Sequence, residues 1–334
     1  MTTIQENNNI NKVLNFQNFD DIKVSTKTFT TMTNLEIEID KLFKILPVTP
    51  YVVVPTKRGR KKKCEKIDPN KDIKHGSFIT IKHEGELRGV ELKPKKLKPG
   101  KKTKWFRNSI TIVIVLDKRI NFKVCRNGTF QMTGCKRLEH AELCVKYLWK
   151  YMKMHPDIYS FTRGKTLETL FIPSMRNIDF SLGFIVDREK LNTYIHEQKK
   201  IFCLLETSFG YTGINIKIPL KKDISTMKVK KMFYDKEVEE WKEVWTTYKE
   251  YLDNLSPKER TAKINNVRYN TFLVFHSGMV IMSGLNDEFM RDIYYYFIDI
   301  IKNSYDKIEE RLLPPGNTDM PVLAELSLEE QLAL

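Results

Sequence analysis

Cysteine is scarce in this sequence, and its arrangement points neither to a metal site nor to disulfide bonds. The five cysteines form no CxxC pair and have no histidine nearby at the spacing of zinc ligands. The N-terminus is polar, unlike an apolar secretory leader, and no apolar run approaches the length of a membrane-spanning helix. These absences argue against a secreted disulfide scaffold, a zinc protein and a membrane protein. We expect an intracellular protein with reduced cysteines.

Sequence motifs of catalysis are absent as well. The chain contains no HExxH, Walker A, GxSxG or Rossmann fingerprint. The neighbours Glu239 and Glu240 fit the charge pattern of an expected helix better than a converging acid–base pair, and His140, His155 and His196 stand alone. We therefore expect no enzyme, no metal, no cofactor and no small-molecule substrate.

What the chain has in excess is positive charge. Its 334 residues include 57 Lys and Arg against 42 Asp and Glu, a net charge of +15. Such a balance favours a polyanionic partner, with nucleic acid as the first candidate, although surface lysines can also serve solubility alone. The densest basic runs lie at 57–63 and 93–104, where solvated loops are the simpler interpretation and phosphate contact is a second role. The candidate phosphate contacts are Lys57, Arg58, Arg60, Lys61, Lys95, Lys96, Lys101 and Lys102.

One phrase occurs twice in the chain, 150 residues apart (272 − 122). Residues 122–135 read FKVCRNGTFQMTGC, and residues 272–285 read FLVFHSGMVIMSGL. Each phrase predicts a strand, a tight turn at Asn-Gly or Ser-Gly and a second strand, and each is followed by an amphipathic helix. A repeat of this period indicates a duplicated half-domain. The residues shared are Phe122/Phe272, Val124/Val274, Gly128/Gly278, Met132/Met282 and Gly134/Gly284.

The flanking segments repeat the same order of elements. Each half is expected to contain a strand, a helix, a run of antiparallel strands and a long helix; in the first half, Asn34 is expected to cap the first helix. Two such halves can join their sheets, so the expected fold class is α+β, with one curved antiparallel sheet and helices on one face. The opposite face would be open, and in a basic protein such a face is a plausible platform for nucleic acid.

An insertion at about 221–268 interrupts the second half. Within it Trp241, Trp245 and Tyr248 recur at helical spacing, which predicts an inserted helix whose aromatic stripe packs against the body of the protein. The expected organisation is a disordered tail at 1–20, a first half with basic insertions at 21–155, a second half at 156–312 and a flexible tail at 313–334.

The repeated pattern, F-x-x-G in the second copy and C-x-x-G in the first, ends six residues later in Thr-Gly or Ser-Gly and is followed by a helix. It resembles the TATA-box-binding protein family. It is most similar to the divergent members that large DNA viruses encode, and the second hairpin carries the more specific match. The resemblance implies a saddle-shaped sheet whose concave face sits on a widened minor groove, with helices on the convex face. It also implies aromatic wedges, two in each half, that insert between base steps.

The resemblance assigns the wedges residue by residue. Phe275 stands three residues before Gly278, and Phe209 stands ten before Pro219, as the family's second-half wedges do. In the first half Cys125 replaces one wedge, and the other position is either Phe106 or Asn108. Phe209 and Phe275 could instead be core residues, since a strand buries about half of its side chains.

The resemblance also implies which side chains face the groove. Alternate residues after each turn should do so, and their small hydroxyl and aliphatic groups suit a surface that separates A·T from G·C. Asn177 matches the family's asparagine at the groove centre, whereas the first-half counterpart near Val24 is not an asparagine. The alternating residues are Thr129, Gln131 and Thr133 in the first half and Met279, Ile281 and Ser283 in the second.

The expected function is that of a non-catalytic transcription initiation factor of a large DNA virus. It would bind AT-rich promoter DNA through the minor groove and present its helices to RNA polymerase and general transcription factors. It would act in a cytoplasmic viral factory or in the host nucleus, and it could be packaged in the virion. The alternative is a scaffold that keeps the fold but has lost DNA contact; Cys125 and the inserted aromatic segment favour it. A nuclease or glycosylase on this fold is disfavoured, because no carboxylates cluster.

Overall fold

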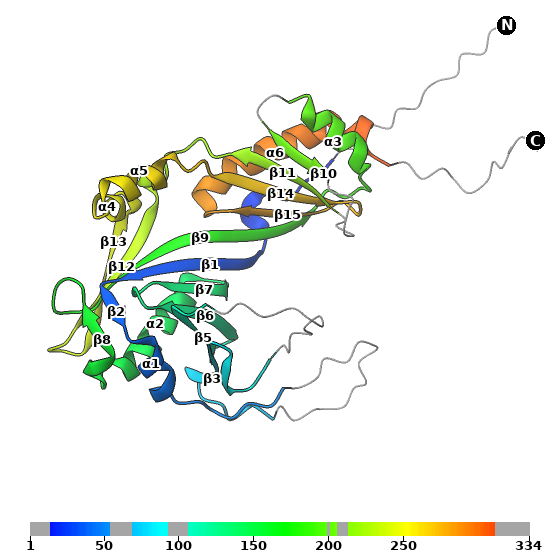
Figure 1. The fold of residues 1–334 in the computed structure, drawn as a ribbon. Helices are drawn as coiled ribbons and strands as arrows, with labels where there is room; N and C mark the ends of the chain where they lie inside the picture. The colour runs from blue at the N-terminus through cyan, green and yellow to red at the C-terminus, as the bar shows by residue number, and fades with distance from the viewer. Residues whose placement is uncertain (1–13, 54–68, 93–105, 199–200, 206–212, 311–334) are drawn as a thin grey trace, which may run out of the picture.

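The computed structural model describes residues 14–53, 69–92, 106–198, 201–205 and 213–310. One curved sheet of thirteen strands runs through the molecule, and every strand pair in it is antiparallel (Figure 1). Eleven strands form a continuous path, and β12 (Lys228–Asp235) and β13 (Glu240–Thr247) branch from β9. In spatial order the path is β10 Phe202–Leu205, β11 Gly213–Pro219, β14 Tyr269–Phe275, β15 Met279–Gly284, β9 Glu168–Ser181, β1 Val24–Thr33, β7 Phe130–Cys135, β6 Arg119–Cys125, β5 Ser109–Val115, β3 Ser77–His83 and β4 Glu86–Gly89.

The strand order is symmetric about the junction of β9 with β1. Outward from that junction, β15, β14, β11 and β10 on one side correspond to β7, β6, β5 and β3 on the other. The two repeated phrases form the hairpins β6–β7 and β14–β15, which occupy equivalent places in the same sheet. The predicted fold class, an α+β saddle-like sheet built from a duplicated unit, is therefore confirmed.

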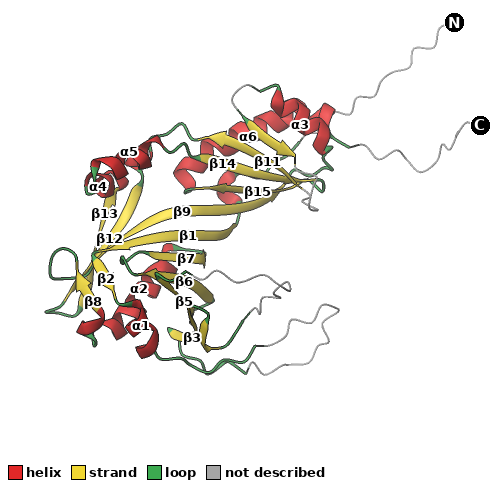
Figure 2. Cartoon of the chain, in the orientation of Figure 1, coloured by secondary structure: helices red, strands yellow, loops and turns green. Residues whose placement is uncertain are grey.

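Helices cover one face of each half of the sheet. Figure 1 shows α3 (Arg188–His196) and α6 (Asp287–Ile308) against one end, and α1 (Ile39–Ile45) and α2 (Leu138–Met152) against the other. Two main cores lie beneath them, one in each half. In Figure 2 the helices keep to the outer side of the sheet, so the other face is largely free of them.

Alternation along the hairpin strands explains which face is covered. Phe272 and Val274 on β14 and Val280 and Met282 on β15 are fully buried beneath α6, where the Phe272 ring stacks on Phe297 with centroids 4.0 Å apart. The equivalent residues of the first half are also buried, and these are Phe122, Val124, Phe130 and Met132. Burying such side chains contributes about 1.5–3 kcal/mol each, so the register of both hairpins is fixed.

The two hairpin turns depend on glycine for the same reason. Gly128 and Gly278 have φ of 70° and 77°, a region that side chains with a Cβ rarely adopt. A Cβ at Gly128 would overlap the carbonyl oxygen of Leu35, and one at Gly278 would overlap that of Phe184. Each turn therefore packs closely against a neighbouring backbone segment, which explains why the repeat retains both glycines.

The structure corrects the prediction for Asn34. Residues Leu35–Ile37 form a short strand, β2, which pairs with β8 (Tyr159–Phe161), and the helix begins only at Ile39. The Asn34 side chain does not cap it: Nδ2 donates to two loop carbonyls and Oδ1 accepts from the Glu168 N–H at 2.9 Å. Leu35 and Ile37 are both buried, which is the two-residue period of a strand.

The inserted segment was predicted as one helix, and this is wrong. It contains η4 (Ile224–Thr226), strands β12 and β13, and the short helices α4 (Tyr248–Asp253) and α5 (Pro257–Asn265). Side chains four residues apart lie on the same face of a helix, and they also lie on the same face of a strand because four is an even number. Trp241 packs on the first-half core as expected, but Trp245 is 61% exposed.

The N-terminal tail predicted to be disordered at 1–20 is partly ordered, because the structure describes it from residue 14. Phe19 in η1 (Phe19–Asp21) is fully buried. The Arg176 and Arg291 guanidinium carbons lie 5.2 and 5.1 Å from the Phe19 ring centroid, and Arg291 also pairs with Asp20. The aromatic anchor and its two cations tie this segment to α6 and β9.

Candidate nucleic-acid interface

The face of the sheet opposite the helices is lined by side chains that alternate with the core. Gln131 and Thr133 on β7 are exposed and Thr129 before that strand is half-buried. On β15, Met279 is 44% exposed, and Ile281 and Ser283 are half-buried. The structure therefore places all six residues expected to face the groove on this open face.

Cross-strand pairing extends the open face beyond the residues that sequence reasoning named. Leu273 pairs with Ile281, and Thr271 pairs with Ser283. In the first half Lys123 pairs with Gln131 and Asn121 with Thr133. These four residues were missed, although they alternate with the buried Phe and Val of the repeated phrases, and that alternation was the signal that could have found them.

Asn177 lies where the two halves meet. It pairs with Thr26 across the junction of β1 and β9 and with Ser283 of β15. The first-half counterpart of Asn177 is therefore Thr26, near Val24, where no asparagine was expected. The Asn177 Oδ1 is buried and has no hydrogen-bond partner among the described residues. The amide at the centre of the open face therefore retains hydrogen-bonding capacity.

The two equivalent wedge positions differ in chemistry. Phe275 ends β14 on the same face as Leu273, is half-buried, and lies opposite Gly213, which has no side chain to cover it. Cys125 ends β6 in the equivalent place, opposite Ser109. Its backbone N–H donates to the Thr129 carbonyl at 2.8 Å, and burial raises the pKa of its thiol. One half thus presents an aromatic ring and the other a neutral thiol.

The alternatives for the remaining first-half wedge lie side by side before β5. Phe106 is 75% exposed, and the Lys123 Nζ lies 4.5 Å from its ring centroid, which places the ring on the open face. Asn108 is also exposed, and its carbonyl accepts from the Arg126 N–H at 3.0 Å. Phe209 and all eight candidate phosphate contacts in 57–63 and 93–104 lie outside the described residues.

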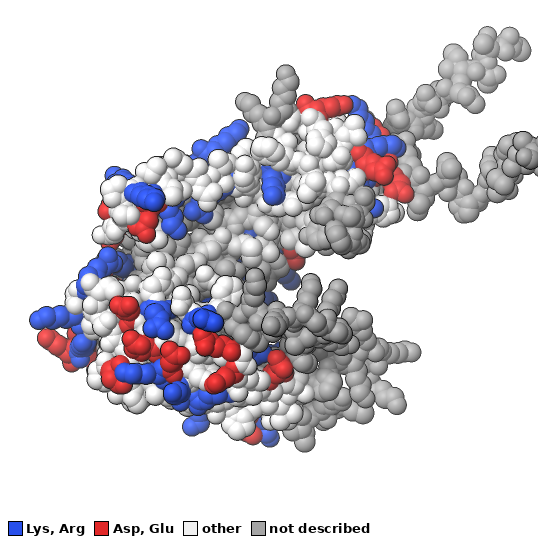
Figure 3. Space-filling model, in the orientation of Figure 1, with Lys and Arg blue, Asp and Glu red and all other residues white. Residues whose placement is uncertain are grey.

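Some charged side chains reach the open face. Figure 3 views the sheet from its edge and shows charged side chains over both ends and at the left, where β12 and β13 lie, with the surface between the two ends set back. The charged side chains that alternate onto this face include Lys123, Lys217 and Asp179. In the described part of the chain, no group of three His, Cys, Asp or Glu side chains could hold a metal ion. None of the described helices is long and apolar enough to cross a bilayer.

Comparison with known proteins identifies two viral relatives, although no protein-family model matches the chain. The "Uncharacterized protein 335L" of Invertebrate iridescent virus 6 is 28% identical over 206 residues, covering 59% of this chain and 60% of that protein. The "TATA-box-binding protein-like" protein of Acanthamoeba polyphaga mimivirus is 29% identical over 227 residues, covering 60% of this chain and 55% of that protein. Over the matched residues, the chain is thus similar to a TATA-box-binding protein-like protein of a large DNA virus. The resemblance predicted from the repeated phrase is thereby confirmed.

The chain matches only part of each relative, because the matched regions span little more than half of the relatives' lengths. Among solved structures, the TBP of Methanococcus jannaschii matches with 12% sequence identity and a TM-score of 0.41, covering 84% of this chain and 98% of that one. The saddle-like sheet is recognised from the symmetric strand order of this chain and does not depend on that comparison.

Proposed function

We propose that this TATA-box-binding-protein-like chain binds double-stranded DNA through the open face of its sheet, in the minor groove of AT-rich promoters. The observation that carries the proposal is the continuity of that face across both halves. It is lined by hydroxyl, amide and aliphatic groups, with Asn177 and Thr26 at its centre. The printed name of the mimivirus relative supports the same interpretation.

The chemistry of the face suits a minor groove. That groove presents acceptors at every A·T pair and an additional amino donor only at G·C pairs. Small side chains such as Ser283 and Thr133 can lie against sugar and base edges, whereas Phe275 at the end of its strand can enter an opened base step. The net charge of +15 supplies the attraction to phosphate that affinity for DNA requires.

In this proposal the protein acts in transcription initiation without catalysing a reaction. It would mark a promoter and present its convex helices and inserted elements to RNA polymerase and general transcription factors. It would do so in a cytoplasmic viral factory or in the host nucleus, and the protein could be packaged in the virion.

A scaffold that has lost DNA contact is the second candidate function. Cys125 in place of an aromatic wedge favours it, and so does β13, which pairs only with β12 among the described strands and leaves its other edge unpaired. Val244 and Trp245 on β13 are 50% and 61% exposed. An unpaired edge strand with exposed apolar side chains is a surface to which another chain can add a strand.

Selection of binding sites from random duplexes, followed by salt titration of the enriched sequences, distinguishes the two candidates. The DNA-binding proposal expects an enriched AT-rich motif and an affinity that falls steeply with salt. Absence of binding even at low salt would leave the scaffold as the surviving candidate. Footprinting of an enriched duplex by minor-groove and major-groove probes then tests which groove is occupied.

A further inference from the structure

A cavity of about 180 Å³ lies beside the open face, between the inserted helices and the central strands. Its walls include Thr30 of β1 and Ser174 of β9 on one side, and Tyr251, Lys263 and Arg268 of the insertion on the other. None of its lining residues is acidic. The cavity therefore combines two cations with several hydroxyl groups.

The cavity belongs to the same face as the proposed DNA contacts. Thr30 pairs directly with Gln131, which is exposed on that face. The Thr30 and Ser174 hydroxyl oxygens are 2.7 Å apart. The register between β1 and β9 shifts here and leaves Ser174 without a direct partner, which is the geometry of a β-bulge. The bulge thus presents an exposed hydroxyl at the edge of the open face.

Neither cation of the cavity forms a salt bridge with a described residue, although the charge of Glu259, one turn before Lys263 on α5, acts on Lys263 from a longer distance. Within the described residues, no carboxylate oxygen lies within 4.0 Å of the Lys263 ammonium or the Arg268 guanidinium. The Lys263 Nζ lies 5.8 Å from the centroid of the Tyr251 ring. The Arg268 guanidinium donates a hydrogen bond to the Tyr248 hydroxyl, but its Nε is buried without a hydrogen-bond partner among the described residues. A buried donor left unpaired in this way carries a free-energy cost that a bound anion would remove.

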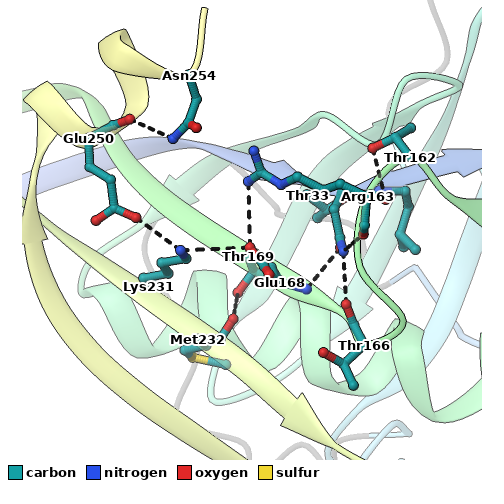
Figure 4. A network of polar contacts seen from close by, with 12 residues as sticks. Thr33, Thr162, Arg163, Thr166, Glu168, Thr169, Lys231, Met232, Glu250 and Asn254 are labelled. Carbon is teal, nitrogen blue, oxygen red and sulfur yellow. Dashed lines mark hydrogen bonds and ion pairs between the residues drawn. The ribbon is translucent and has the colours of Figure 1, made fainter.

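A second cavity nearby, of about 170 Å³, shows the opposite arrangement. It also contains two cations, but each is paired: Lys231 lies 2.9 Å from a Glu250 oxygen and 3.7 Å from one of Glu168, and Arg163 lies 3.5 Å from Glu168 (Figure 4). Two carboxylates neutralise the two cations there, so that cavity has no charge to offer a ligand. The contrast singles out the Lys263–Arg268 cavity.

We propose that the Lys263–Arg268 cavity binds a phosphate group and that, resting on the proposed function, this group is a phosphate of the bound DNA backbone. A guanidinium, an ammonium and neighbouring hydroxyls are the donors that hold phosphate oxygens. Ser174 is three residues from Asn177 along β9, which at the rise of a strand is about 10 Å. A backbone bordering a groove centred on Asn177 would therefore pass within reach of the cavity.

The site would make the saddle unequal in its two halves. The insertion interrupts only the second half, so the described part of the first half has no counterpart to Lys263 and Arg268. A phosphate contact on one side of a nearly symmetric surface favours one of the two orientations on a DNA site. The inserted helices would then help to set the direction in which the protein faces along a promoter.

The test compares the variants Lys263→Gln and Arg268→Gln with the full-length parent and with Lys258→Gln. Lys258 is exposed on the same helix α5 but does not line the cavity, so it controls for the loss of one charge. Anisotropy of a short AT-rich duplex over a salt series gives the slope of log K against log salt. Each cavity variant should reduce the slope by about 1, and Lys258→Gln should not. Equal slopes in all four proteins, or an equal loss in Lys258→Gln, would overturn the proposal.

A second arm uses inorganic phosphate alone and separates this site from the proposed function. Thermal unfolding of the parent in phosphate against chloride, at matched ionic strength, should show a rise in Tm that Arg268→Gln loses. If no duplex binds but this difference is present, the phosphate site stands and the DNA-binding function fails. If duplex slopes are unchanged while inorganic phosphate stabilises only the parent, the cavity binds the free ion and its role in DNA contact is overturned. If neither measurement separates Arg268→Gln from the parent, the cavity binds no phosphate.

Discussion

Phe275 and Cys125 occupy the same place in two equivalent hairpins, so the proposed function expects the two halves to deform DNA unequally. If the open face binds DNA, Phe275→Ala should remove most of any kink and cost about 1–3 kcal/mol of binding free energy, the usual scale for a lost base–aromatic contact. Cys125→Ala should change little, and Cys125→Phe should strengthen binding or bending. The DNA bend, measured by FRET, and the binding affinity are determined for all three variants. Unchanged bending in Phe275→Ala, with folding verified, would make that ring a core residue.

The turn glycines allow a prediction about stability with a matched control. Gly278→Ala should destabilise the protein by more than the roughly 1–2 kcal/mol expected for a positive φ alone, because the added methyl group would overlap the Phe184 carbonyl. Gly183 has a similar φ of 83°, but a methyl group added there would have no atom within 4 Å, so Gly183→Ala should incur only the backbone cost. Urea unfolding of both variants measures the difference. Equal losses would show that the Phe184 backbone moves aside freely.

At the scale of elements, the insertion of the second half is tied to the first half by a buried ion pair. Lys230 on β12 lies 2.7 Å from Glu142 on α2 and 2.6 Å from Glu243 on β13. Glu142→Gln should therefore cost about 3 kcal/mol of folding free energy, because it leaves a buried ammonium with one carboxylate fewer. Arg260→Gln, which breaks an exposed pair with Asp253, should cost about 0–1 kcal/mol. Equal losses in denaturant unfolding would contradict this difference.

The same pair has a defined pH dependence. Burial alone would lower the pKa of Lys230, but hydrogen bonds to Glu142 and Glu243 outweigh it and raise that pKa above its ordinary value of 10.5. A group with a raised folded-state pKa stabilises the protein fully below its unfolded pKa and loses that contribution as pH rises through the folded pKa. The pair should therefore support the insertion throughout the neutral range and release it only above pH 10.5. The unfolding free energies of the parent and of Lys230→Gln, measured from neutral pH to above pH 10.5, should therefore converge as the pH rises.

Sequence patterns predicted the duplicated elements well and the insertion poorly. The repeated hairpins follow from buried residues at every second position, a pattern that only a strand satisfies over six residues. Trp241 and Trp245 are four residues apart, which fits a helix and a strand equally. Their strand conformation is decided by pairing with β12, a contact that the local sequence does not contain. Asn34 was misassigned for a similar reason, since its partners lie in the distant loop before β9.

At the scale of the whole molecule, the open face could be predicted but the cavity beside it could not. Thr133 and Ser283 follow from alternation, whereas Lys263 and Ser174 come together only because the insertion folds against the bulge in β9. The pairing of β9 with β1 brings two hairpins far apart in sequence into one sheet. A long-period repeat can reveal such a surface, but an insertion that occurs once has no second copy to compare.

The net charge of +15 belongs to the whole molecule, and its densest runs provide the last prediction. Replacing the lysines and arginines of 57–63 and 93–104 with serine should make the slope of log K against log salt shallower, because fewer counterions are released when fewer phosphates are neutralised. Site preference should be largely kept, since phosphate contacts position a protein while base-edge contacts specify the sequence. Salt titrations on the selected duplex and on a scrambled one measure both quantities. An unchanged slope would show that these runs do not touch phosphate, and a lost preference would show that they read the bases.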